Sequence, residues 1–235
     1  MTLVNKIKIV SLFLLIIGFS NIFAQTEEYD TWDNQIYLGN KIAFGKNKWH
    51  FSGELQTRLR NNFRSLDNWY VEFVADYLVA KNIEIVPDFR YTIKPNKTEI
   101  RPGFGILYKI NRNKYQFVNQ LKWQTDFGSD DNVGHAFREV IFSNYKINDQ
   151  LVATLVAGFI YRWWPGEWDG FQYIRTGPGI SYIFDEKHIL NFSYFVGVEN
   201  KRDYWLWAGI PMVQLVINVA KKEEYTSAPA YYFDF

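Results

Sequence analysis

The chain has 235 residues, with 26 basic and 25 acidic side chains and a formal net charge of +1 at pH 7. This near balance gives nucleic-acid binding no electrostatic support. The chain has no cysteine, which excludes a disulfide-stapled scaffold, a zinc site built on thiolates and a lipoprotein anchor.

The first segment has the features of a secretion signal. Lys6 and Lys8 precede an apolar run from Ile9 to Phe19. That run is too short for a membrane-spanning helix, which needs about 20 apolar residues, and it matches the apolar core of a cleaved signal peptide. We predict a signal peptide over residues 1–24, whose removal leaves 24 basic and 25 acidic residues. Residues 25–235 contain no linker-like composition and are expected to form one domain.

Alternation of apolar and polar residues predicts β-strands along the rest of the chain. From Trp49 to Arg60 every second residue is apolar, small or Thr, and the residues between them are polar or charged. This period of two is that of a strand with one apolar and one charged face. The segment from Trp69 to Val79 follows the same rule. Further runs begin near Ile36, Ile83, Ile100, Tyr115, Phe137, Leu151, Ile174 and Ile189, and two more are expected from Tyr204 to Val219 and from Tyr225 to Phe235.

The lengths of these strands favour a membrane barrel. Many reach 10 to 12 residues, whereas strands of soluble proteins most often have about 5 to 6 and tilted membrane strands need about 9 to 11. No apolar stretch after the signal is long enough for a helical span, so a closed barrel is the remaining way to cross a bilayer. We predict an all-β, antiparallel up-and-down transmembrane barrel of about 12 strands (10 to 12) in the outer membrane.

Connection lengths predict two different rims. Short polar turns are expected at 45–48, 80–82, 111–114, 148–149 and 185–188. Longer loops are expected from Asn61 to Asn68, from Asp126 to Gly134 and from Trp164 to Gly170. Outer-membrane barrels carry their longer loops outside the cell, which places these three loops there. An even number of strands with both termini in the periplasm conflicts with this orientation if the Ile36 strand is the first, and we give the loop lengths more weight.

Aromatic residues support the membrane prediction. Trp49, Trp69, Trp123 and Trp163 fall near strand ends, where interfacial aromatic girdles lie, in contact with outer-membrane lipids. The last residues, Tyr231 to Phe235, alternate towards a terminal phenylalanine and resemble the signal that barrel proteins present to the barrel-assembly machinery. We expect a monomer.

One short motif occurs twice. Ile100-Arg-Pro-Gly-Phe-Gly-Ile-Leu-Tyr108 recurs as Ile174-Arg-Thr-Gly-Pro-Gly-Ile-Ser-Tyr182. We expect the two copies to occupy equivalent places in two hairpins, with Arg101 and Arg175 pointing inward. Pro87, Pro102 and Pro178 each remove a donor from the sheet and are expected to mark bulges.

With these residues identified, the sequence from 25 to 235 resembles an uncharacterised family of outer-membrane barrels, known only as a domain of unknown function, of Bacteroides-type bacteria. The resemblance is carried by the Trp49 strand with Glu54 and Arg58, the Asp88-Phe-Arg-Tyr91 segment, the Ile100-Arg-Pro-Gly motif and the aromatic end. It implies location and architecture, and it supplies no activity, no catalytic residues and no cofactor.

The polar face of the strands is expected to line the lumen. The predicted lumen-facing residues are Glu54, Arg58, Glu72, Asp76, Glu84, Asp88, Arg90, Glu99, Arg101, Lys109, Lys122, Arg138, Arg162 and Arg175. They indicate either a narrow polar pore or a network of ion pairs that fills the lumen. We favour the filled lumen, because long side chains leave little room in a barrel of this size. A structural or narrow channel-like role follows.

Three alternatives have weaker support. A soluble exported β-sandwich that binds a ligand would show the same alternation, but not such long strands. A lipid or lipopolysaccharide hydrolase could use His50, Ser52 and Glu54, which share one strand face, yet that face points into the lumen. The tryptophans of 163–168 could bind a sugar, although a membrane anchor explains them with fewer assumptions. His135 and His188 are expected in a loop and a turn, and we expect no catalytic, cofactor or metal site.

Overall fold

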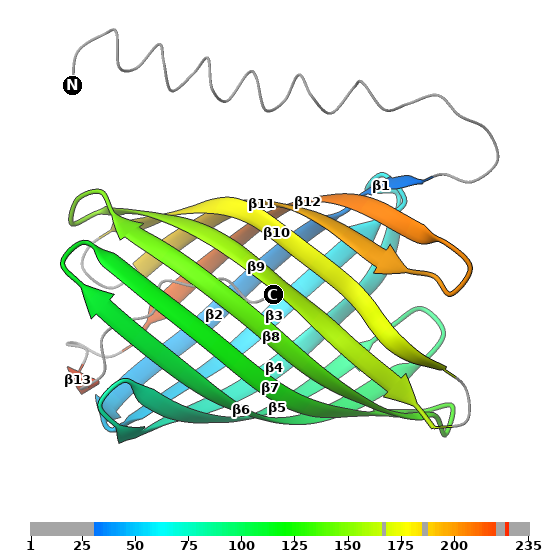
Figure 1. Ribbon diagram of the computed structural model, residues 1–235, viewed down its shortest axis with the longest axis horizontal. Coiled ribbons are helices and arrows are strands. Elements are labelled where there is room, and N and C mark those ends of the chain that lie inside the picture. Colours follow the sequence, from blue (N-terminus) through cyan, green and yellow to red (C-terminus); the bar gives the residue numbers. More distant parts are fainter. Residues whose placement is uncertain (1–30, 166–167, 185–187, 220–223, 226–235) are drawn as a thin grey trace, which may run out of the picture. The chain divides into compact units, whose positions relative to one another are not determined.

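A computed structural model describes residues 31–165, 168–184, 188–219 and 224–225. These residues form one sheet of thirteen strands (Figure 1). The strands are β1 (Trp32–Asn34), β2 (Ile36–Asn47), β3 (Trp49–Arg60), β4 (Ser65–Ala80), β5 (Ile83–Ile93), β6 (Thr98–Arg112), β7 (Tyr115–Gly128), β8 (Val133–Lys146), β9 (Leu151–Trp164), β10 (Trp168–Phe184), β11 (His188–Asn200), β12 (Trp205–Asn218) and β13 (Glu224–Tyr225). The predicted signal peptide and Phe235 lie outside the described residues, as does the predicted last strand except for Tyr225.

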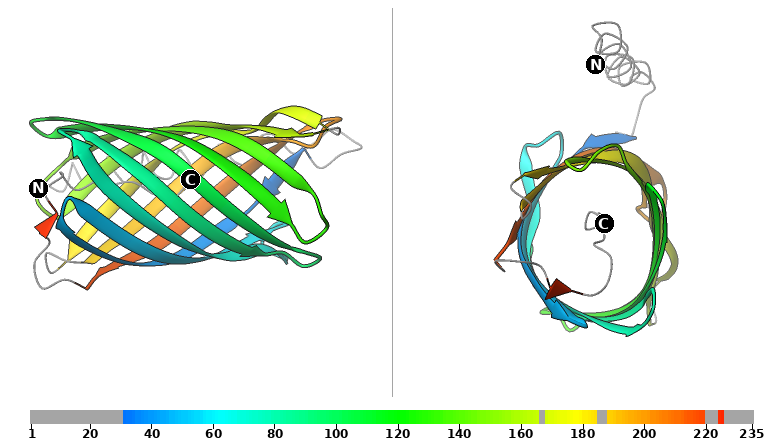
Figure 2. Two further views of the ribbon diagram at one scale, coloured as in Figure 1. Left: turned by 90° about the horizontal axis from the view of Figure 1, so that it is seen from below. Right: turned by 90° about the vertical axis from the view of Figure 1, so that its left-hand side faces the viewer.

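The strands from β2 to β12 close into a ring of eleven (Figure 2). Each strand pairs antiparallel with the next, and β12 closes the ring by pairing with β2 in parallel, from Met212 opposite Tyr37 to Asn218 opposite Ala43. β1 extends this seam at one end and β13 pairs with β2 at the other. The predicted all-β up-and-down barrel is confirmed, within the predicted range of strands. The expected even number of strands is wrong for this ring, because a barrel with an odd number of strands can close through one parallel pair.

The strands are longer than predicted and the loops shorter. The first two of the three expected long loops shrink to residues 61–64 and 129–132, and β9 and β10 extend into the third. Residues that suggested a loop belong to strands instead: Asp126 lies inside the ring on β7, and Gly134 is the second residue of β8. On the opposite rim, left-handed backbone at Asn47, Asn82 and Asn113 permits tight turns. The two rims therefore differ in connection length much less than the sequence suggested.

The three prolines do not shift the register of their strands. The irregularities lie between Arg58 and Leu59, between Leu78 and Ala80, and between Phe171 and Tyr173. At each proline the pairing with one neighbouring strand is interrupted, while pairing with the other neighbour continues through Pro87, Pro102 and Pro178. The predicted bulges at these positions are wrong, because a missing donor on one side is tolerated without an extra residue.

Alternation along every strand gives the ring two chemically different faces. Side chains such as Ile42, Phe73 and Leu155 point outward and are 54%, 59% and 57% exposed. Their neighbours in sequence point inward, where both ionic and apolar side chains are buried. The outward face is therefore predominantly apolar and accessible, which is the reverse of a soluble protein.

The parallel seam predicts one specific crosslink. Leu38 and Val213 are direct partners, and neighbouring strands lie about 4.8 Å apart, within disulfide reach. We expect the double variant Leu38→Cys/Val213→Cys to form a disulfide, detected as a mobility shift on a non-reducing gel. The control Leu38→Cys/Leu215→Cys, two residues out of register, should stay reduced. Equal crosslinking of both pairs, or of neither, would contradict the seam.

Candidate functional site: the charged interior

The structure places all of the predicted lumen residues on the inner face. Glu54, Glu72, Asp76, Asp88, Arg90 and Arg175 are buried, and Arg58 and Arg101 are half-buried. Of the predicted interface aromatics, Trp49 and Trp123 are exposed on the outer face and Trp69 and Trp163 are half-buried there. The interior is thus the part of the described chain where polar chemistry is concentrated.

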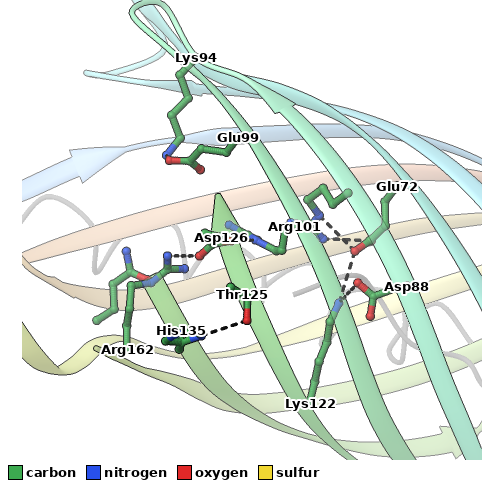
Figure 3. Close-up of polar contacts among 12 residues, drawn as sticks. Glu72, Asp88, Lys94, Glu99, Arg101, Lys122, Thr125, Asp126, His135 and Arg162 are labelled. Carbon is green, nitrogen blue, oxygen red and sulfur yellow. Dashed lines mark hydrogen bonds and ion pairs between the residues drawn. The ribbon is translucent and has the colours of Figure 1, made fainter. Parts of the chain in front are cut away.

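A network of four charged side chains joins three strands inside the ring. Arg90 on β5 donates from Nε and Nη2 to the two carboxylate oxygens of Glu72 on β4, at 3.1 and 3.0 Å. Lys122 on β7 lies with Nζ 2.6 Å from Oδ1 of Asp88 and 3.4 Å from Oε1 of Glu72 (Figure 3). A Cβ at position 103 would meet both Lys122 and Asp88, so the glycine of the repeated motif makes room for this ion pair. Two carboxylates and two cations balance one another here.

A second cluster surrounds Asp126. Its two carboxylate oxygens accept hydrogen bonds from Arg101 on β6 and from Arg162 on β9 (Figure 3). Arg162 also donates from Nε to the amide oxygen of Gln172, at 2.8 Å. One buried carboxylate therefore compensates two guanidinium groups. Sequence reasoning missed Asp126, although it continues the period of two through Lys122 on β7.

Tyrosine rings stack against arginine side chains in the same region. The guanidinium carbon of Arg58 lies 4.3 Å from the ring centre of Tyr37 and 5.2 Å from that of Tyr70. Arg90 lies 3.8 Å above the Tyr70 ring. Such stacking stabilises a cation in a site of low dielectric without neutralising it. These tyrosines occupy inward positions of their strands, a signal that the sequence contained but that we did not single out.

Arg175 completes this cluster from the opposite wall. Its guanidinium carbon is 4.0 Å from the centre of the Tyr173 ring and 5.4 Å from that of Tyr37. A Cβ at position 197 would meet the Cγ of Arg175 at 2.7 Å, so a glycine on β11 makes room for the arginine stem. Arg58 and Arg175 therefore approach the same tyrosine from two strands. Each copy of the repeated motif thus contributes one arginine to the interior, Arg101 and Arg175.

The other half of the interior contains smaller polar pairs. Lys109 lies with Nζ 2.7 Å from Glu84, and Glu54 lies 3.2 Å from Nζ of Lys41 while accepting a hydrogen bond from Gln214 at 2.9 Å. The predicted hydrolase residue His50 is on the inner face, with Nδ1 2.8 Å from Asp76. The structure therefore pairs His50 with a carboxylate on β4.

An apolar layer separates these two polar regions. It is a contiguous cluster of buried residues from strands on both sides of the ring. The members are Tyr37, Val86, Leu107, Val118, Val140, Phe142, Val156, Phe195, Ala208, Ile210 and Met212, with Val74 and Tyr173 packed against them. On β5 to β9 these residues lie nearer the rim of the short turns than the arginines do. The layer therefore places apolar side chains on the inner wall between the two polar regions.

A small ionic cluster lies at the rim formed by the loops after β5 and β7. Lys97 donates from Nζ to Asp130 at 2.9 Å, and Lys94 lies 2.6 Å from Glu99. The hydrogen bond from Lys97 lowers the pKa of Asp130 below its ordinary value. Asp130 is therefore ionised throughout the neutral range, and its bond to Lys97 ties the two loops together.

Two predicted positions of histidines are wrong. His135 belongs to β8 and His188 to β11, not to a loop and a turn. His135 points outward and is hydrogen-bonded at 3.0 Å to Thr125 (Figure 3). The centre of its ring lies 5.6 Å from that of Trp163. In the described part of the chain no group of three or more His, Asp or Glu side chains is arranged to hold a metal ion. The described residues include no helix long and apolar enough to cross a membrane.

Comparison with known proteins finds similarity among solved structures but not among sequences. No protein-family model and no curated protein matches the sequence. Among solved structures, the NanC porin in a rhombohedral crystal form is similar, with 10% sequence identity and a TM-score of 0.48 over 72% of this chain and 88% of the porin. The resemblance of the sequence to an uncharacterised family of outer-membrane barrels stays a prediction.

Asp126 should be essential for the stability of the interior. Asp126→Asn removes the charge that compensates Arg101 and Arg162, and we expect a loss of about 3 to 5 kcal/mol in the free energy of unfolding, measured by urea titration in lipid vesicles. The control Asp130→Asn, at the exposed rim, should unfold like the parent. A loss confined to the control, or equal behaviour of the two variants, would contradict this role.

Proposed function

We propose that the chain is an integral outer-membrane barrel protein with a narrow, channel-like polar interior. The observation that carries the proposal is the reversal of faces in the ring: apolar side chains outside, and ion pairs inside. A bilayer is the surroundings in which such an outer face is favourable. The closed ring also leaves no edge strand between β2 and β12, which a lipid environment requires.

Aromatic residues near both rims support this proposal. Near the short-turn rim, Trp49 packs against Tyr77 with ring centres 4.5 Å apart, and Tyr115 against Tyr145 at 5.0 Å. Near the opposite rim, Trp123 and Trp163 lie 4.6 Å apart. Tyrosine and tryptophan favour the boundary between lipid and water. Two aromatic bands with an apolar belt between them match the girdles of a membrane barrel.

The interior supports a narrow passage and not a wide pore. Charged side chains occupy both ends of the interior, and the buried apolar layer lies between them. A layer of this kind resists wetting and restricts ions. We therefore propose that only small polar solutes enter, and that ion flow through the protein at rest is low.

The proposal also covers the export of the chain, its assembly into the membrane and its oligomeric state. The signal peptide at residues 1–24 would deliver the chain across the inner membrane, and Phe235 would engage the barrel-assembly machinery. Outer-membrane lipids would surround a monomer. The hydrolase alternative gains no support, because His50 and Ser52 lie on the inner face, away from the lipid that such an enzyme would cleave.

The membrane location predicts a large effect of one outward charge. Phe73 lies in the middle of β4 and is 59% exposed. Phe73→Arg should lower the free energy of unfolding in bilayers by about 2 to 4 kcal/mol, because an arginine at the midplane faces hydrocarbon. Phe73→Leu is the control and should stay close to the parent. If the two variants unfold alike in vesicles, Phe73 does not face lipid.

The apolar layer predicts a constriction that can be opened. Phe142 belongs to the layer and is 1% exposed, whereas Phe104 points outward and is 51% exposed. In planar bilayers we expect small currents from the parent and a larger single-channel conductance from Phe142→Ala, since the truncation opens the layer. Phe104→Ala should conduct like the parent. A parent that conducts like a wide pore, unaffected by Phe142→Ala, would refute the narrow interior.

A further inference from the structure

The charged residues of the interior are not evenly distributed. Seven cations lie between the apolar layer and the rim opposite the short turns, the region called here the upper interior. They are Arg58, Arg90, Arg101, Lys122, Arg138, Arg162 and Arg175. The carboxylates that contact them are Glu72, Asp88 and Asp126. The excess of positive charge lies in surroundings of low dielectric, where an unbalanced charge has a strong effect. This region is therefore suited to attract an anion.

Two of the arginines, Arg58 and Arg175, account for half of this excess. Arg90 is paired with Glu72, and Arg101 and Arg162 share Asp126. Arg58 and Arg175, by contrast, contact no carboxylate within the ranges that the structure describes. Arg58 donates from Nε to Gln56 at 2.7 Å, and its other contacts are with tyrosine rings. The charges of these two guanidinium groups are stacked on aromatic rings but not neutralised.

One donor of Arg58 is buried without an acceptor. Its Nη2 atom is buried and makes no hydrogen bond with any residue that the structure describes. An unpaired buried donor costs free energy that a ligand can recover by accepting the bond. Guanidinium groups bind carboxylate and phosphate oxygens with the same paired geometry. The unused donor thus indicates the chemistry of the missing partner.

The geometry of the cluster brings several arginines to one place. Arg58 and Arg175 both lie against the Tyr37 ring, at 4.3 and 5.4 Å. Tyr173, on which Arg175 is stacked, is within electrostatic reach of Arg58, Arg101 and Arg138 as well. Tyr173 also packs against the apolar layer. The arginines therefore converge next to the apolar layer.

We propose that Arg58 and Arg175, with Tyr37 and Tyr173 beneath them, form a binding site for a small oxyanion, the carboxylate or phosphate group of a solute that enters the barrel. The site deepens the proposed function, on which it rests, by giving the chemical class of that solute. The apolar layer below the site holds the solute at the constriction.

Binding of simple oxyanions by the purified full-length barrel tests the site. Potassium phosphate and potassium acetate are titrated into the protein in detergent micelles, against potassium chloride at equal ionic strength, and binding is followed by calorimetry. We expect saturable binding of one oxyanion per chain for phosphate, acetate or both. The stronger of the two identifies the preferred group. Binding no tighter than that of chloride would overturn the proposal.

Variants locate the binding. Arg58→Gln and Arg175→Gln should each weaken the affinity at least about tenfold, the loss of roughly one charge-assisted hydrogen bond. Arg58→Lys, which keeps the charge but loses the planar donor pair, should give an intermediate affinity. Arg64→Gln removes one charge from an exposed connection and should bind like the parent. Equal affinities in all four variants would overturn the site even if the parent binds.

Two features keep the test decisive. If one glutamine variant does not fold, the other lies on a different strand and still reports on the site. Because binding is measured in micelles, it does not depend on membrane location or conductance. A barrel that binds oxyanions without conducting would contradict the channel-like function and leave the site intact, whereas a conducting barrel that binds none would contradict the site alone.

Discussion

Closure of the ring through β2 and β12 is the constraint on which the rest of the structure depends. Eleven strands satisfy one another's backbone hydrogen bonds in sequence, and the parallel seam from Met212 to Asn218 satisfies the two remaining edges. An open sheet with this apolar face would expose unpaired backbone groups to lipid or to other chains. Closure also separates the two faces completely, so that alternation along each strand becomes a division between inside and outside.

The inside of the ring shows how buried charge is tolerated and where it is not balanced. Glu72 and Asp126 are each held by cations from other strands, and glycines such as Gly103 and Gly197 give the long side chains room. Burial of such groups is unfavourable unless they are paired. A region with more guanidinium groups than carboxylates is then costly for stability, and a site that binds an anion provides a reason to keep it.

The sequence predicted the direction of side chains better than the ends of strands. Alternation assigned Glu54, Arg58 and Arg175 to the inner face, because facing depends only on a period of two. It failed at Asp126, where a polar residue on the inner face was taken for the start of a loop. The parallel seam and the contacts of Arg58 with Tyr37 could not be predicted, since they depend on which distant strands become neighbours, and local alternation contains no information on that.

The central claim is that the outer face of the ring contacts lipid. Photolabelling of the unmodified protein in bilayers, with a diazirine on a lipid acyl chain and mass-spectrometric mapping, tests it without any substitution. We predict labels at Phe73, Ile42 and Leu155, which are 59%, 54% and 57% exposed, and none at the inward Val156, which is 0% exposed. Labels on Val156 as strong as on its neighbour Leu155, or no labels on the outward residues, would contradict the account.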